Sequence, residues 1–172
     1  MSCPLTTGFV LDCKDSIGGV KSVSFASVTD YEALTPVVLA GAITSITATP
    51  TFRKYEQLKE TSSMTETINA SMQNGTVYYT PEVVVVLSKL NATKRNEIMV
   101  LAQNRLVALV ETNDEVPAYW LVGVTSGLEV SGGTSATGTA YADLQGYNIT
   151  LGGMEPISMV SISAVDAASI TF

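Results

Sequence analysis

The chain has 172 residues, no histidine and a charged fraction of only 15%, against roughly 25% in typical domains. The missing histidine removes the commonest general base at neutral pH and the commonest metal ligand. A net charge of −7 argues against direct binding to nucleic acid, because such binding uses Lys and Arg to neutralise phosphates. The length fits one domain, residues 1–172, and the weakly charged surface is expected to contact other subunits.

The first fifty residues are expected to hold an arm and two strands. Residues 1–19 contain proline and glycine with little periodicity, which predicts an extended N-terminal arm. Val20–Val28 and, more loosely, 41–49 alternate like strands, and Tyr31–Pro36 is expected to form a turn or a short excursion. No targeting segment precedes them, so the protein is expected to be made and kept in the cytoplasm.

The middle of the chain predicts an extension followed by a buried strand. Residues 53–75 are expected to form a hairpin or loop extension, in which 64–70 alternates like a strand with one exposed side. Asn74–Gly75 predicts a tight turn. Val83–Leu87 has high β propensity and no charge, so it must be a central strand or be covered by a partner. It is far too short to cross a bilayer.

One helix is expected in the chain. Asn91 is a good N-cap, and residues 92–104 contain good helix formers. Ile98, Leu101 and Ala102 have the spacing of an apolar helix face that can lie against a sheet, and Arg105 continues this spacing.

The last third of the chain returns to strands. Arg105–Glu111 and Tyr119–Val124 are expected to pair as a hairpin. The glycine- and serine-rich segment 131–138 predicts a flexible loop, and Gln145–Gly152 predicts another strand. Ile157–Phe172 alternates only weakly. One helix and many short strands therefore predict a mainly β fold, two packed antiparallel sheets in a sandwich or barrel with one flanking helix.

Few residues suggest chemistry. Asp114–Glu115, and Asp12 and Asp15 around Cys13, could act as paired carboxylates, but they are interpreted as solvated turn charges because no nucleophile motif or metal spacing accompanies them. Cys3 and Cys13 could form a disulfide or half of a metal site. Without histidine or a second cysteine pair, two reduced thiols are the simpler interpretation.

Two further patterns also have structural explanations. Gly132–Gly133 and Gly152–Gly153 lack the spacing of phosphate-binding loops and are interpreted as flexible hairpin loops. Tyr78–Tyr79 and Tyr119–Trp120 could stack on bases or sugars, but within alternating strands one member of each pair normally faces the core. The sequence therefore predicts no catalytic, cofactor-binding or metal-binding residue.

A set of segments within residues 70–155 has a familiar order. The segments are Asn74–Tyr79, Leu87–Leu90, Lys94–Ile98, Leu101–Asn104, Tyr119–Gly123, Gly127–Leu128 and Asp143–Leu151. This order resembles the tail-tube-like and ring-like virion proteins of tailed bacteriophages, especially those that infect Bacteroidetes.

The resemblance implies two packed antiparallel sheets with a flanking helix, and hexameric or twelve-fold rings around a lumen that conducts DNA. It also implies that sheets of neighbouring subunits join, and that arms or loops bridge stacked rings; residues 1–19 and 53–75 are the candidates for such bridges. The family has no catalytic residues to transfer.

The expected function is that of a non-enzymatic structural protein of the virion, a subunit of a tail tube or head–tail ring assembled in the host cytoplasm. It would associate with itself and with other tail or connector proteins, without a cofactor and without insertion into a membrane. DNA would pass through the lumen without specific binding. The alternative is a non-catalytic β-sandwich binding module, an adhesin or carbohydrate-binding domain, suggested by the aromatic pairs. An enzyme using carboxylates or the two cysteines is a third interpretation.

Overall fold

Eleven strands and two helices make up the described part of the chain in a computed structural model, which describes residues 8–9, 14, 16–32, 37–39, 42–45, 51–114 and 118–162. In chain order these elements are β1 Val20–Ser27, α1 Val28–Glu32, β2 Val37–Leu39, β3 Ala42–Ser45, β4 Arg53–Glu56, β5 Ser63–Ser71, β6 Thr76–Ser88, α2 Ala92–Gln103, β7 Leu106–Thr112, β8 Tyr119–Val122, β9 Glu129–Ala136, β10 Gly146–Gly152 and β11 Val160–Ile162.

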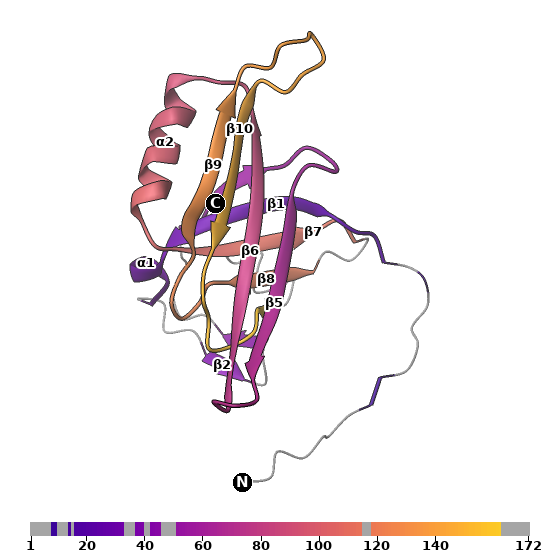
Figure 1. The fold of residues 1–172 in the computed structure, drawn as a ribbon, viewed down its shortest axis with the longest axis vertical. Helices are drawn as coiled ribbons and strands as arrows, with labels where there is room; N and C mark the ends of the chain where they lie inside the picture. Colours follow the sequence, from indigo (N-terminus) through magenta and orange to yellow (C-terminus); the bar gives the residue numbers. More distant parts are fainter. Residues whose placement is uncertain are drawn as a thin grey trace.

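The strands form two sheets. The seven-stranded sheet has the order β2-β3-β11-β8-β7-β1-β4, and the four-stranded sheet has the order β5-β6-β10-β9. All pairs are antiparallel except β11 with β3. Strands β1, β7 and β8 cross strands β5, β6, β9 and β10 steeply in Figure 1, as in orthogonal sheet packing. The predicted mainly β class with two packed sheets is confirmed.

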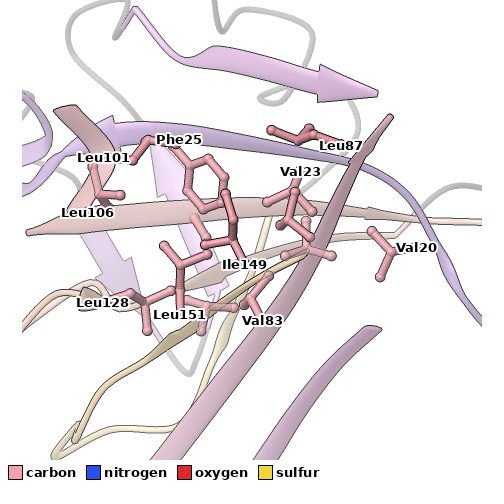
Figure 2. Close-up of a cluster of buried hydrophobic side chains, with 14 residues drawn as sticks. Val20, Val23, Phe25, Val83, Leu87, Leu101, Leu106, Leu128, Ile149 and Leu151 are labelled. Carbon is pink, nitrogen blue, oxygen red and sulfur yellow. The ribbon is translucent and has the colours of Figure 1, made fainter. Parts of the chain in front are cut away.

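Most of the core lies between the two sheets. The period-2 alternation of strands places Val23 and Phe25 of β1 opposite Val83 of β6 and Ile149 and Leu151 of β10, and all five side chains are buried (Figure 2). Burying a side chain of this size stabilises the fold by about 1.5–3 kcal/mol. The uncharged Val83–Leu87 segment belongs to β6, which lies between β5 and β10, so its prediction as a central strand is confirmed.

The seven-stranded sheet is apolar on both faces. Along β7, Ala108 and Val110 point to the four-stranded sheet, while Val107 and Leu109 belong to a second buried cluster on the opposite face. Tyr31 of α1 is also part of that second cluster. A turn or short excursion is expected from Tyr31, but Tyr31 lies in the short helix α1, which ends at Glu32 and packs on the sheet; residues 33–36 lie outside the described part.

The flanking helix and the late hairpin agree with the sequence. The Asn91 side chain accepts a hydrogen bond from the backbone N–H of Lys94 at 2.7 Å and caps α2. Leu101 is buried, but Ala102 is exposed, so the expected apolar face is narrower than its spacing predicts. Strands β7 and β8 pair with Glu111 opposite Tyr119, which confirms the predicted hairpin.

The flexible loop expected at 131–138 is wrong, because most of it belongs to β9. Gly132 and Gly133 lie opposite Thr150 and Ile149 of β10, beside a shift of register between Thr150 and Leu151. A Cβ atom on Gly133 would lie 3.1 Å from the Asn148 carbonyl oxygen, so glycine here permits close approach of two backbones. Glycine and serine content indicates flexibility only where no partner strand supplies hydrogen bonds.

The two expected bridging segments have different outcomes. Most of the arm 1–19 lies outside the described residues. Segment 53–75 is divided between the sheets, because β4 pairs with β1 while β5 pairs with β6. The predicted turn at Asn74–Gly75 joins β5 to β6, and this hairpin reaches the lower end of the molecule in Figure 1.

Candidate interaction surface

The outer face of the four-stranded sheet, which points away from the seven-stranded sheet, is the leading candidate surface. Register pairs place Thr67 beside Thr80 and Thr65 beside Glu82 on this face. Further along the sheet, Asn148 and Thr150 of β10 lie on the same side, because they alternate with the core residues of that strand. Hydroxyl and amide groups therefore cover much of a face that has no helix over it in Figure 1.

The charges of this sheet all have one sign. Strands β5, β6, β9 and β10 contain no lysine or arginine, and their only charged residues are Glu66, Glu82 and Glu129. Glu82 and Glu129 are both opposite Gly152 in register, so their side chains project from the same face. Such a face repels phosphate groups rather than binding them.

Both edges of the four-stranded sheet lack a further partner strand among the described residues, and α2 lies beside the edge strand β9 (Figure 1). The edge strand β5 has nine residues and pairs only with β6, and the edge strand β9 has eight and pairs only with β10. Neither strand contains lysine, arginine or proline, the residues that natural edge strands use against pairing with another chain. The edge of β6 beyond β5 is different, because the Gln57 and Ser62 side chains accept hydrogen bonds from Val86 N–H there.

A hollow of about 630 Å³ opens beside the end of β10. Pro81, Gly152 and Met154 contribute to its lining, and Glu82 and Glu129 lie on it. Gly152 leaves the space between the two carboxylates open, because an added Cβ there would meet no atom closer than 3.8 Å.

A buried carboxylate fixes one rim of this hollow. Glu155 is 3% exposed and accepts three backbone hydrogen bonds, from Thr125 at 3.2 Å, Ser126 at 2.8 Å and Gly127 at 3.1 Å. Its own backbone pairs with Tyr79 and extends the β6–β10 ladder. Glu155 therefore attaches the 125–127 loop to the four-stranded sheet.

A second polar cluster lies on the face of the seven-stranded sheet that points away from the four-stranded sheet. Glu111 is 6% exposed, and its carboxylate contacts Lys21 Nζ at 2.6 Å, Ser22 Oγ at 2.7 Å and Lys54 Nζ at 3.5 Å. Burial alone would raise the pKa of Glu111, but the hydrogen bonds from Lys21 and Ser22 and the two lysine charges outweigh burial and lower it. The cluster leaves only a 30 Å³ space, so it is interpreted as a structural ion pair.

The residues singled out in the sequence do not converge. Asp114 accepts hydrogen bonds from the Ile17 N–H and the Thr112 hydroxyl, and so holds a turn. Gly152–Gly153 lies at the hollow, whereas Gly132–Gly133 lies within β9. The remaining carboxylates and thiols lie outside the described residues: Cys3, Asp12, Cys13, Asp15 and Glu115.

The aromatic pairs are split between sheet faces. Tyr78 is exposed, and Tyr79, the next residue along β6, is half-buried on the opposite face. The Tyr119 hydroxyl donates to Glu111 at 3.5 Å, while Trp120 pairs with Val110 on the other side of the sheet. Neither pair therefore presents two adjacent rings on one surface for stacking.

Sequence reasoning missed the two buried carboxylates. Glu111 had a signal, since it is the only charged residue in the otherwise apolar strand β7. Glu155 had none, because its three backbone donors lie about thirty residues earlier in the chain. Within the described ranges, no three His, Cys, Asp or Glu side chains are grouped so as to hold a metal ion, and no helix has the length and apolar character to span a membrane.

Comparisons with known proteins give no relative for this chain. No family model matches it, and neither the curated proteins nor the solved structures contain a significant match.

Proposed function

We propose that the protein is a self-assembling structural subunit of a phage tail tube or head–tail ring. The observation that carries the proposal is the four-stranded sheet, in which two edge strands lack a further partner strand and the outer face has carboxylates and hydroxyls but no lysine or arginine from its four strands. The order of motifs that resembles tail-tube-like virion proteins supports the same function.

The two edge strands without a further partner strand support assembly. Strands β5 and β9 are similar in length and belong to one sheet, so pairing β5 of one copy with β9 of the next extends that sheet without a break. An interface between two different edges is heterologous, and it generates a ring when the rotation between copies closes. Ring closure would pair both edge strands, which removes the hazard of two long unpaired strands that contain no lysine, arginine or proline.

The charge of the outer face supports passage of DNA. If this face lines the lumen, each subunit presents Glu82 and Glu129 and no lysine or arginine from its four strands. Like charge then disfavours contacts between the lumen surface and the phosphates of the duplex. The duplex can therefore move along the lumen without having to break such contacts.

The proposal is tested by electron microscopy and light scattering of the purified protein. We expect wild-type protein to form rings or tubes with a central hole. Thr65→Lys on β5 and Ser135→Lys on β9 place a positive charge on each exposed edge strand, and each variant should remain monomeric. Gln103→Lys adds the same charge at an exposed position at the end of α2 and should assemble like wild type.

Two results would contradict the proposal. One is a wild-type protein that stays monomeric at high concentration, both alone and with the tail and connector proteins of its own virus. The other is normal ring formation by both edge variants. Circular dichroism of each variant verifies that loss of rings does not reflect loss of folding.

A further inference from the structure

We propose that the groove between α2 and β4 binds a small aromatic molecule with a single negative charge, whose anionic group contacts Arg53 and Lys94. This is a ligand site that the proposed function does not require. The part of the groove that holds the ligand contains no residue of β5 or β9, so its test does not depend on whether rings form.

The groove consists of two neighbouring hollows. One, of about 420 Å³, lies between β4, the end of β6 and the first turns of α2, and is called the α2–β4 hollow below. The other, of about 410 Å³, continues along α2 toward Leu106. Arg53, Tyr55 and Glu97 line both, and the Tyr55 hydroxyl donates to Glu97 at 3.0 Å, which joins β4 to α2. Each hollow has the size of a small-molecule site, roughly 300–1,000 Å³.

The walls of the α2–β4 hollow suit an aromatic ring. Leu87 at the end of β6 and Tyr55 of β4 line it, together with Thr93 of α2. The Tyr55 ring is half-buried and packs edge-on against Phe25, with the ring centroids 5.4 Å apart. Its position is therefore fixed before a ligand arrives. A second ring packed on Tyr55 would bury apolar area on both partners and gain the preferred geometry of an aromatic pair.

Basic side chains are concentrated at the same hollow. The chain has nine lysines and arginines, and three of them, Arg53, Lys54 and Lys94, line it. Arg53 is exposed and makes no hydrogen bond or ion pair with another described residue. The Lys94 ammonium donates to the Ser88 carbonyl oxygen, which leaves two of its three N–H donors. The Lys54 ammonium contacts Glu111 at 3.5 Å, so it is not assigned to the anion.

Two carboxylates limit the ligand to one charge and determine its orientation. Glu97 lines the α2–β4 hollow and would repel a second anionic group. Burial, together with the hydrogen bond to Glu97 and its charge, raises the pKa of Tyr55, so the hydroxyl stays protonated and donates to Glu97 at neutral pH. Asp30 lines only the second hollow and makes that end unfavourable for an anion. The anionic group is therefore expected beside Arg53 and Lys94, where charge-assisted hydrogen bonds are available.

The first test compares two fluorescent probes that differ only in charge. Anilinonaphthalene sulfonate has two aromatic parts and one sulfonate, and N-phenylnaphthylamine is the same molecule without the sulfonate. We expect the sulfonate to bind at one saturable site per chain, about tenfold tighter than the neutral probe. Equal affinities for the two probes, or no saturable binding of the sulfonate, would overturn the inference. Equal affinities would mean that the probes only adsorb to exposed apolar surface.

The second test changes the charges of the site one at a time. Arg53→Gln should weaken binding of the sulfonate about tenfold and leave the neutral probe unchanged. Glu97→Gln should strengthen binding of the sulfonate, because it removes the carboxylate nearest to the bound anion. Lys59→Gln makes the same change of charge at an exposed position outside the hollow and should bind like wild type.

Two patterns among the variants would overturn the site. One is an equal loss of sulfonate affinity in Arg53→Gln and Lys59→Gln, which would indicate a response to net charge alone. The other is weaker binding of the sulfonate by Glu97→Gln, which would mean that Glu97 does not face the bound anion. Circular dichroism of each variant verifies folding. Rings or their absence in the same samples test only the proposed function, so the two results remain distinguishable.

Discussion

Lys21 Nζ lies 2.6 Å from Glu111 Oε1, across the pair of strands β1 and β7. The pKa of Glu111 is below its ordinary value of 4.5, because these contacts outweigh the effect of burial. A carboxyl whose folded pKa is depressed contributes stability that is fully present above the unfolded pKa and is lost as pH falls through the folded pKa. Glu111→Gln should therefore be less stable than wild type near pH 6, and the difference should shrink toward pH 3.

Urea unfolding of both proteins across this pH range measures the difference, in which contributions from the other carboxylates cancel. The loss at neutral pH should be about 1–2 kcal/mol, since exposed Lys21 can return to water when its partner is removed. A difference that stays constant from pH 6 to pH 3 would show that the Glu111 charge does not stabilise the fold.

Glu155→Gln should destabilise the protein by about 2 kcal/mol. The three N–H groups of residues 125–127 need an acceptor, and a glutamine amide turns one of its two polar atoms into a donor. The matched control is Glu129→Gln, which removes an exposed carboxylate and should change the free energy of unfolding by less than about 0.5 kcal/mol. Equal stability of the two variants would contradict the role assigned to Glu155.

Gly146→Ala should destabilise the protein, whereas Gly132→Ala should not. A Cβ atom on Gly146 would lie 2.2 Å from the Leu87 carbonyl oxygen, so the β6–β10 backbone would have to separate at a cost of about 1–3 kcal/mol. Gly132 has no atom within 4 Å of its Cβ position and no positive φ. Alanine there should be neutral or add about 0.4–1 kcal/mol by restricting the unfolded chain. Thermal unfolding of the two variants should separate them clearly.

Asn91→Ala should lower the free energy of unfolding by about 1 kcal/mol, the usual cost of losing an N-cap. Asn91→Ser keeps a side-chain acceptor for the Lys94 N–H and should lose much less. Unfolding measured by circular dichroism tests both variants, and equal losses would mean that the cap hydrogen bond does not stabilise α2.

The local sequence pattern was sufficient to predict the elements whose interaction partners are close in the sequence. The N-cap at Asn91, the turn at Asn74–Gly75 and the hairpin between β7 and β8 all depend on neighbouring residues, and the structure has each of them. Strand β9 was missed because its stability comes from β10, whose register with Gly132 and Gly133 cannot be derived from glycine content. The same limit applies to Glu155, since a carboxylate that binds a distant loop resembles any solvated acid in the sequence.

The interaction surface could be predicted from the sequence only in part, for the same reason. Composition shows that acidic residues outnumber basic ones, but it does not show that β5, β6, β9 and β10 share one sheet. Only that arrangement places every lysine and arginine outside the sheet and leaves β5 and β9 as its two edges. The hollow near Gly152 depends in turn on a loop from a different part of the chain.

The absence of basic residues from the four-stranded sheet also determines which reagents can detect it. Arg105 is the last trypsin site in the chain, so digestion leaves residues 106–172, which include β9 and β10, as one long peptide. Cross-linkers that react with amines have no target on these four strands. Carbodiimide coupling through Glu66, Glu82 and Glu129 is therefore the chemistry that can map neighbours of this sheet.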